Sequence, residues 1–195
     1  MSSHYFVKEG QEPALMILDA MPFSAAADLL AWAPLIVVSD RALEAVGTWG
    51  IKIDVVFGVS GDQRSNDKLL EDQQPVHIIT AADQHSGLRA VFSYLHSMQN
   101  SAVVMIADKP EEMISSVDGI TDLDITIQDQ VLRWSRITHE FHKWLSAGTR
   151  FRLFFPEGAL PHVEGAEEQN GVFVTTSDGI VSILPHQSFW IGEYF

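Results

Sequence analysis

The sequence predicts an α/β protein in two parts: an open, parallel-type α/β sheet domain at residues 1–118 and a small antiparallel β-sandwich domain at 119–195. Two observations support this. In the first part, short and almost wholly apolar runs alternate with amphipathic stretches, which is typical of parallel strands covered by helices on both faces. In the second part, short strand-like runs follow one another with turn signals between them.

The strands and helices of the first part follow from that alternation. Four- and five-residue apolar runs predict strands, while apolar residues at helical spacing predict helices. The expected strands are 14–18, 35–38, 54–57, 76–79 and 102–106, and the expected helices are 23–32, 41–49 and 87–98. Because open α/β sheets bind ligands at the carboxyl ends of their strands, we expect a site near Asp19, Asp40, Gly58 and Asp83.

The second part reads as strands separated by polar turns such as Ser177-Asp178-Gly179. The expected strands are 124–128, 131–135, 150–155, 171–175, 179–184 and 189–194. The acidic segment 161–170 is expected to be a loop. A β domain of this size has little core of its own and would gain from packing on the first domain or on a second subunit.

Composition and charge restrict the function classes. The chain has 195 residues, of which 46% are hydrophobic, and its formal net charge is −14. Such a charge disfavours nucleic acid and anionic membranes as partners, because both bind basic protein surfaces.

The absence of cysteine excludes disulfides, thiolate metal sites and a cysteine nucleophile. No apolar run approaches the roughly 20 residues of a membrane span, and the N-terminal sequence lacks a secretory h-region. We expect a cytoplasmic protein.

Four sequence stretches carry a resemblance to a known family. They are VVSDRAL at 37–43, GIKIDVVFG at 50–58 and DQHSG at 83–87, with TTSD at 175–178 near the end of the chain. In type, order and spacing these resemble the motifs of thiamine pyrophosphokinases, and the resemblance covers nearly the whole chain. It implies pyrophosphate transfer from Mg-ATP to thiamine, giving thiamine diphosphate and AMP, in a homodimer whose thiamine pockets involve the β domain.

The resemblance also assigns candidate residues. Phosphate binding is implied for Asp40, Arg41, Gly58, Asp62 and Ser86, substrate binding for Gln84 and Ser177, and Mg²⁺ binding for Asp40, Asp62 and Asp83. Mg²⁺ held by carboxylates would neutralise the phosphate charges during transfer.

The sequence departs from the family pattern at the metal ligands. Val59 and Gly61 stand where the G-D-x-D-S motif has its two aspartates, and Asp62 falls one position later. Gly87 replaces the aspartate of the T-D motif, where Ser86 stands for the threonine. Arg41 replaces the first glycine of A-D-G-G. One of the four motif carboxylates, Asp40, remains in place.

Each surviving carboxylate also has a structural interpretation. Asp40 could cap the helix expected at 41–49, Asp83 could cap the next helix, and Asp62 could be a turn residue. Three function hypotheses therefore stay open. The protein is a pyrophosphokinase with rearranged metal ligands, a non-catalytic dimer that binds a nucleotide or a thiamine-like ligand, or an unrelated α/β protein that binds a nucleotide or sugar phosphate.

Two further groups of residues have structural interpretations that outweigh functional ones. His139 and His142 would share one face of a helix, but the sequence offers no third metal ligand, so a surface pair is expected. Trp134, Trp144 and Trp190 could stack on a heteroaromatic ligand, although core or interface packing is the more common role of such residues. The sequence contains no P-loop and no G-x-S-x-G elbow.

Overall fold

The computed structural model describes residues 12–32, 34–59, 69–155, 162–184 and 188–195, and divides into two compact units, 1–125 and 126–195. The division falls after Ile125, whereas the sequence placed it after residue 118. The predicted fold class is confirmed: a parallel α/β sheet in the first unit is followed by antiparallel strands in the second.

Five parallel strands form the sheet of the first unit, in the order β5-β1-β2-β3-β4. They are β1 (Ala14–Ile17), β2 (Ile36–Ser39), β3 (Val55–Val59), β4 (His77–Ala81) and β5 (Ala102–Ile106). All residues of β1 and β2 are buried, as their apolar sequences, which only Ser39 at the end of β2 interrupts, predict for strands covered on both faces. The core on one side of this sheet includes Leu15, Val38, Leu43 and Val56.

The helices of the first unit differ in length from the sequence prediction. The described helices are η1 (Phe23–Ala25), α1 (Ala27–Leu30), α2 (Leu43–Gly47), η2 (Glu71–Gln73), α4 (Gln84–Ser97) and α5 (Pro110–Val117). The helix expected at 23–32 is thus a 3-10 turn followed by a four-residue α-helix. In the described ranges, no helix has both the length and the apolar character needed to span a membrane.

The second unit contains two antiparallel layers. One continues from β6 (Asp124–Gln128) in the order β6-β7-β14-β9-β12-β11, and the other has the order β10-β13-β8. The remaining strands are β7 (Leu132–Ile137), β8 (Phe141–Leu145), β9 (Arg150–Phe154), β10 (His162–Glu164), β11 (Ala166–Gln169), β12 (Val172–Thr175), β13 (Gly179–Leu184) and β14 (Phe189–Tyr194). Their shared core takes Phe151 and Phe189 from one layer and Val181 and Ile183 from the other, which makes the unit a β-sandwich.

Two predictions about the second unit need correction. The segment 161–170 is not a loop, because it contains β10 and β11. His142 lies on β8 rather than on a helix, where its Nδ1 is 2.9 Å from Ser182 Oγ on the neighbouring strand. Trp134 and Trp190 are buried in the unit, as expected of core residues, and Trp144 is 61% exposed on β8.

Candidate functional site

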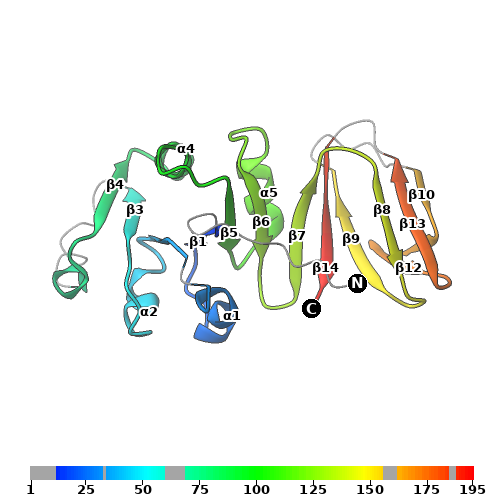
Figure 1. Ribbon diagram of the computed structural model, residues 1–195, viewed down its shortest axis with the longest axis horizontal. Coiled ribbons are helices and arrows are strands. Elements are labelled where there is room, and N and C mark those ends of the chain that lie inside the picture. The colour runs from blue at the N-terminus through cyan, green and yellow to red at the C-terminus, as the bar shows by residue number, and fades with distance from the viewer. Residues whose placement is uncertain (1–11, 33, 60–68, 156–161, 185–187) are drawn as a thin grey trace. The chain divides into compact units, whose positions relative to one another are not determined.

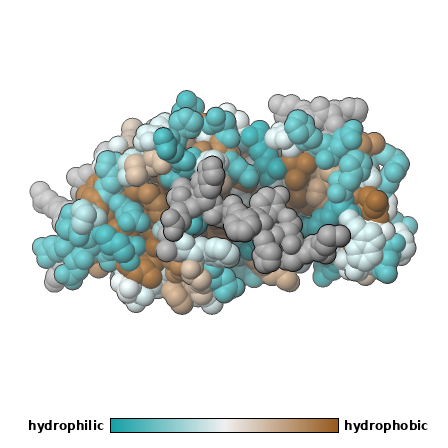
Figure 2. Space-filling view, in the orientation of Figure 1, coloured by the Kyte–Doolittle hydropathy of each residue, from teal (hydrophilic) through white to brown (hydrophobic). Residues whose placement is uncertain are grey.

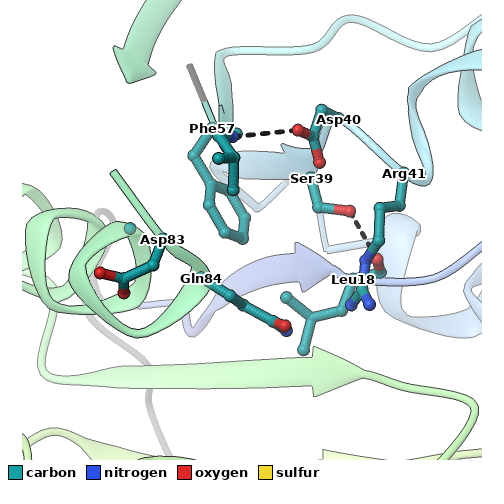
Figure 3. Close-up of a pocket in the computed structure, with 10 residues that line it drawn as sticks. Leu18, Ser39, Asp40, Arg41, Phe57, Asp83 and Gln84 are labelled. Carbon is teal, nitrogen blue, oxygen red and sulfur yellow. Dashed lines mark hydrogen bonds between the residues drawn. The ribbon is translucent and has the colours of Figure 1, made fainter. Parts of the chain in front are cut away.

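A hollow lies at the carboxyl ends of β1, β2 and β3, beside the start of α4 (Figure 3). Its volume is about 140 Å³. This is the edge where the sequence predicts a ligand site, because the strands end there and the chain turns into loops and helices. The lining residues are Leu18, Ser39, Asp40, Arg41, Phe57, Gly58, Val59, Asp83, Gln84 and Gly87.

The carboxylate of Asp40 is directed across the ends of two neighbouring strands (Figure 3). Its Oδ2 accepts a hydrogen bond from the backbone N–H of Val59 at 3.1 Å, and its own N–H donates to the carbonyl of Phe57 at 2.8 Å. Asp40 therefore does not cap α2, the structural role that the sequence suggested. The Ser39 hydroxyl accepts a hydrogen bond from the N–H of Ala42 at 3.3 Å in the turn before α2, and α2 itself has no side-chain cap.

The carboxylate of Asp83 caps α4. It accepts a hydrogen bond from the backbone N–H of Ser86 at 2.8 Å, while the Ser86 hydroxyl accepts from the N–H of Asp83 at 3.2 Å. This capping box satisfies two backbone donors that a helix start leaves free. Hydrogen bonds from the Ser86 backbone and then from its side chain lower the pKa of Asp83. In Figure 3 the Asp83 carboxylate points away from Asp40.

A second hollow of about 250 Å³ adjoins the first, and both are lined by Arg41 and Gln84. The Gln84 side chain extends towards Leu18 and Arg41 (Figure 3). Helix α5 and the residues before it form much of the second hollow. Its lining is Asp19, Arg41, Gln84, Asp108, Lys109, Glu112, Met113 and Ser116.

The guanidinium of Arg41 stands where the two hollows meet. Its Nη2 lies 3.1 Å from Oδ1 of Asp19, and Oδ2 of Asp19 accepts a hydrogen bond from the N–H of Asp108 at 3.0 Å. The Arg41 side chain is 52% exposed. A second ion pair, between Lys109 Nζ and Glu112 Oε1 at 2.9 Å, lies in the second hollow.

The structure brings together five of the predicted site residues. Asp40, Arg41, Gly58, Asp83 and Gln84 all line the first hollow. Ser86 is part of the capping box of α4 and lines neither hollow. Ser177 belongs to the second unit, in the exposed turn between β12 and β13. Asp62 lies outside the described residues.

The Mg²⁺ site that the sequence resemblance implies would be formed by Asp40, Asp83 and Asp62, the last of which lies outside the described residues. Mg²⁺ takes oxygen ligands in near-octahedral geometry, usually from one or two carboxylates together with phosphates and waters. In the part of the chain that the structure describes, no three His, Asp or Glu side chains group closely enough to hold a metal ion. Asp40 and Asp83 each accept a hydrogen bond from a backbone N–H group with one carboxylate oxygen. Mg²⁺ with ATP stays a prediction, to which Asp62 could contribute.

The sequence prediction missed the residues that α5 brings to the second hollow. The segment 109–117 was not expected to be a helix. A signal was present, since Pro110 occupies the first helical position and two glutamates follow it in the first turn. That pattern would have placed Lys109 and Glu112 at a helix start after β5, and hence at the ligand edge of the sheet.

Comparison with known proteins gives similarity in structure but not in sequence. No protein-family model matches the chain, and no curated protein matches it. Among solved structures, the thiamin pyrophosphokinase of yeast superposes with a TM-score of 0.66 at 12% identity, over 96% of this chain and 88% of that one. The thiamine pyrophosphokinase of Bacillus subtilis gives 0.53 at 14% identity, over 93% of each chain.

A Lactobacillus plantarum protein, whose description states no function, gives a TM-score of 0.65 at 12% identity over 94% of this chain and 99% of that one. At these identities the likeness concerns the fold. The order of an α/β sheet followed by a β-sandwich, matched across almost the whole length of these chains, gives this protein the fold of the thiamine pyrophosphokinases.

Proposed function

We propose that this protein binds a small heterocyclic ligand, a nucleotide or a thiamine-like molecule, in the hollows at the carboxyl ends of β1–β3, and that it does not transfer pyrophosphate. The observation that carries the proposal is that the site's two described candidate metal ligands do not converge, since Asp83 caps α4 with its carboxylate pointing away from Asp40 (Figure 3). Asp40 accepts a hydrogen bond from Val59 N–H, and Asp83 accepts one from Ser86 N–H.

Pyrophosphate transfer from ATP places several negative charges close together, and enzymes neutralise them with Mg²⁺ and positively charged side chains. A carboxylate that binds Mg²⁺ must present an oxygen to it. Asp40 and Asp83 each use one oxygen for a backbone N–H group, and in the part of the chain that the structure describes no third ligating side chain groups with them. Val59 and Gly87, which stand at motif positions for metal ligands, supply no oxygen from their side chains.

Pyrophosphokinase activity is the second candidate function, and the fold favours it. The solved thiamine pyrophosphokinases match over 93–96% of this chain. In that case the thiamine hydroxyl would attack the β-phosphorus of Mg-ATP and AMP would leave, with the metal held by Asp40, Asp62 and Asp83.

One assay separates the two candidates. The purified chain is incubated with Mg-ATP and thiamine, and AMP and thiamine diphosphate are quantified by mass spectrometry beside an active thiamine pyrophosphokinase. We expect neither product above background, together with saturable binding of ATP or thiamine by calorimetry. Formation of AMP and thiamine diphosphate in equal amounts would overturn the proposal, and the variant Asp62→Asn would then identify a metal ligand by a loss of rate.

We further propose a cytoplasmic homodimer joined through the β-sandwich units. Trp144 on β8 and Ile180 on β13 support this, since they are direct cross-strand partners and are 61% and 63% exposed. Figure 2 shows hydrophobic residues at the surface among hydrophilic ones, and these two are among the most exposed in the described ranges. A second copy would cover this pair with the same apolar pair, as two-fold symmetric interfaces do.

A further inference from the structure

Two adjoining hollows that meet at one arginine suggest how a ligand would be recognised. We infer that Arg41 binds a single anionic group, so that the site selects a flat heterocycle carrying one phosphate over one carrying two or three. This inference rests on the binding function proposed above, and names the class of ligand. It follows from how Arg41 is held, from the lining of the first hollow and from the charges around both hollows.

Arg41 is held in place by a fixed carboxylate. The Asp108 N–H binds one oxygen of Asp19, which leaves the other oxygen turned to the guanidinium at 3.1 Å. A guanidinium carries five N–H donors in one plane. With one edge on Asp19 and half of the side chain exposed, Arg41 can offer its other donors to the oxygens of a phosphate.

The first hollow is suited to an apolar, flat group. The side chains of Leu18, Phe57 and Val59 line it with apolar surface. Gly58 and Gly87 also line it and have no side chains to fill it. At Gly87, a Cβ atom would lie 3.5 Å from the Phe57 ring, so the start of α4 packs close to this ring. Small-molecule sites commonly combine apolar walls of this kind with a few polar groups at one end.

The charges around the two hollows limit the ligand to one phosphate. Among the described residues, five carboxylates line them, against two cations, and each of these cations is paired with a carboxylate: Arg41 with Asp19, and Lys109 with Glu112. Each further phosphate would bring negative charge towards the unpaired carboxylates of Asp40, Asp83 and Asp108. The repulsion between like charges grows as water is excluded from the space between them. A single phosphate that binds the Arg41 guanidinium would avoid this repulsion.

The experiment measures binding to the full chain by calorimetry in magnesium-free buffer. Two series are compared: thiamine with its mono- and diphosphate, and adenosine with AMP and ATP. We expect the monophosphate to bind at least 10-fold more tightly than the other members of one series, and the series in which it does so identifies the heterocycle. Arg41→Gln should weaken monophosphate binding at least 10-fold and leave binding of the unphosphorylated compound unchanged. The control is Arg89→Gln on the exposed side of α4, which should change neither.

Three results would overturn the inference. These are tighter binding of ATP or thiamine diphosphate than of the corresponding monophosphate, equal binding by Arg41→Gln and Arg89→Gln, and no binding by any compound. The last result would also remove the binding half of the proposed function. The catalytic half is decided separately by AMP and thiamine diphosphate formation. Circular dichroism of Arg41→Gln, with Arg41→Lys as a second variant that keeps the charge, separates a loss of ligand contact from a loss of folding.

Discussion

The side chain of Asp40 occupies the space that a side chain at Gly58 would need. A Cβ atom on Gly58 would lie 2.7 Å from the Asp40 Cβ and 2.6 Å from its Cγ. The missing side chain on β3 is therefore what lets the Asp40 carboxylate reach across from β2 and accept the Val59 N–H. Gly58 is part of the site because of this close approach.

The substitution Gly58→Ala should displace Asp40 and break its hydrogen bond to Val59. Forcing a methyl group into an occupied space costs about 1–3 kcal/mol, and urea denaturation should show a loss of that size. The control is Gly47→Ala at the end of α2, where a Cβ would meet nothing within 4 Å. It should leave stability unchanged or raise it by up to about 1 kcal/mol. Equal stabilities of the two variants would show that Asp40 moves aside without cost.

Gly192→Ala tests the packing of the β-sandwich. Gly192 lies directly opposite Trp134 in the β14–β7 pairing, and a Cβ there would lie 2.9 Å from the indole ring. Since Trp134 is buried, we expect a loss of about 1–3 kcal/mol in stability and a shift in tryptophan fluorescence. Gly179→Ala, where a Cβ would have open space, is the matched control. An unshifted spectrum in Gly192→Ala would mean that the ring is not held against this strand.

Asp83→Asn should remove a pH dependence of folding. Hydrogen bonds from Ser86 lower the pKa of Asp83 in the folded chain, so its ionised form stabilises the fold. That contribution is present above the unfolded pKa of about 4 and is lost as pH falls through the lower folded value. Asparagine also caps helices but does not titrate in this range. The stability difference between wild type and Asp83→Asn, measured by denaturation at a series of pH values, should therefore shrink below pH ~4.

An equally large difference at every pH would show that the hydrogen bonds from Ser86 do not depend on the charge of Asp83. Asp72→Asn, at an exposed position in η2, is the control for a general effect of removing one carboxylate. We expect no comparable change for that variant.

Trp144→Ser tests the proposed dimer. Removing an exposed indole from β8 takes away the largest apolar group of the Trp144–Ile180 pair, so light scattering should show a shift from dimer to monomer at micromolar concentration. Trp32→Ser removes an indole that is similarly exposed, 67%, in the first unit and should leave the dimer intact. A wild-type monomer, or a dimer in both variants, would exclude this pair as the interface.

The strands were easier to predict than the helices, and the reason is visible in particular elements. Residues 102–106, 124–128, 179–184 and 189–194 form strands with the predicted bounds, because apolar or alternating runs between turn residues have few other ways to be buried. Helix α1 is only four residues long although its apolar spacing suggested more. The polar strands β10 and β11 carry too little apolar pattern to be recognised, since pairing with β13 and β12 is what orders them.

The sequence by itself determined the fold class, the edge of the sheet where a ligand would bind, and the loss of carboxylates from the motif positions, because periodicity and residue type are local properties. Only the tertiary structure decided what the remaining polar groups do. It turned Asp40 to Val59, and it brought Asp19 and α5 to Arg41. Those relationships join residues that are distant along the chain, and hydrogen-bond geometry at such separations is set by packing and not by spacing in sequence.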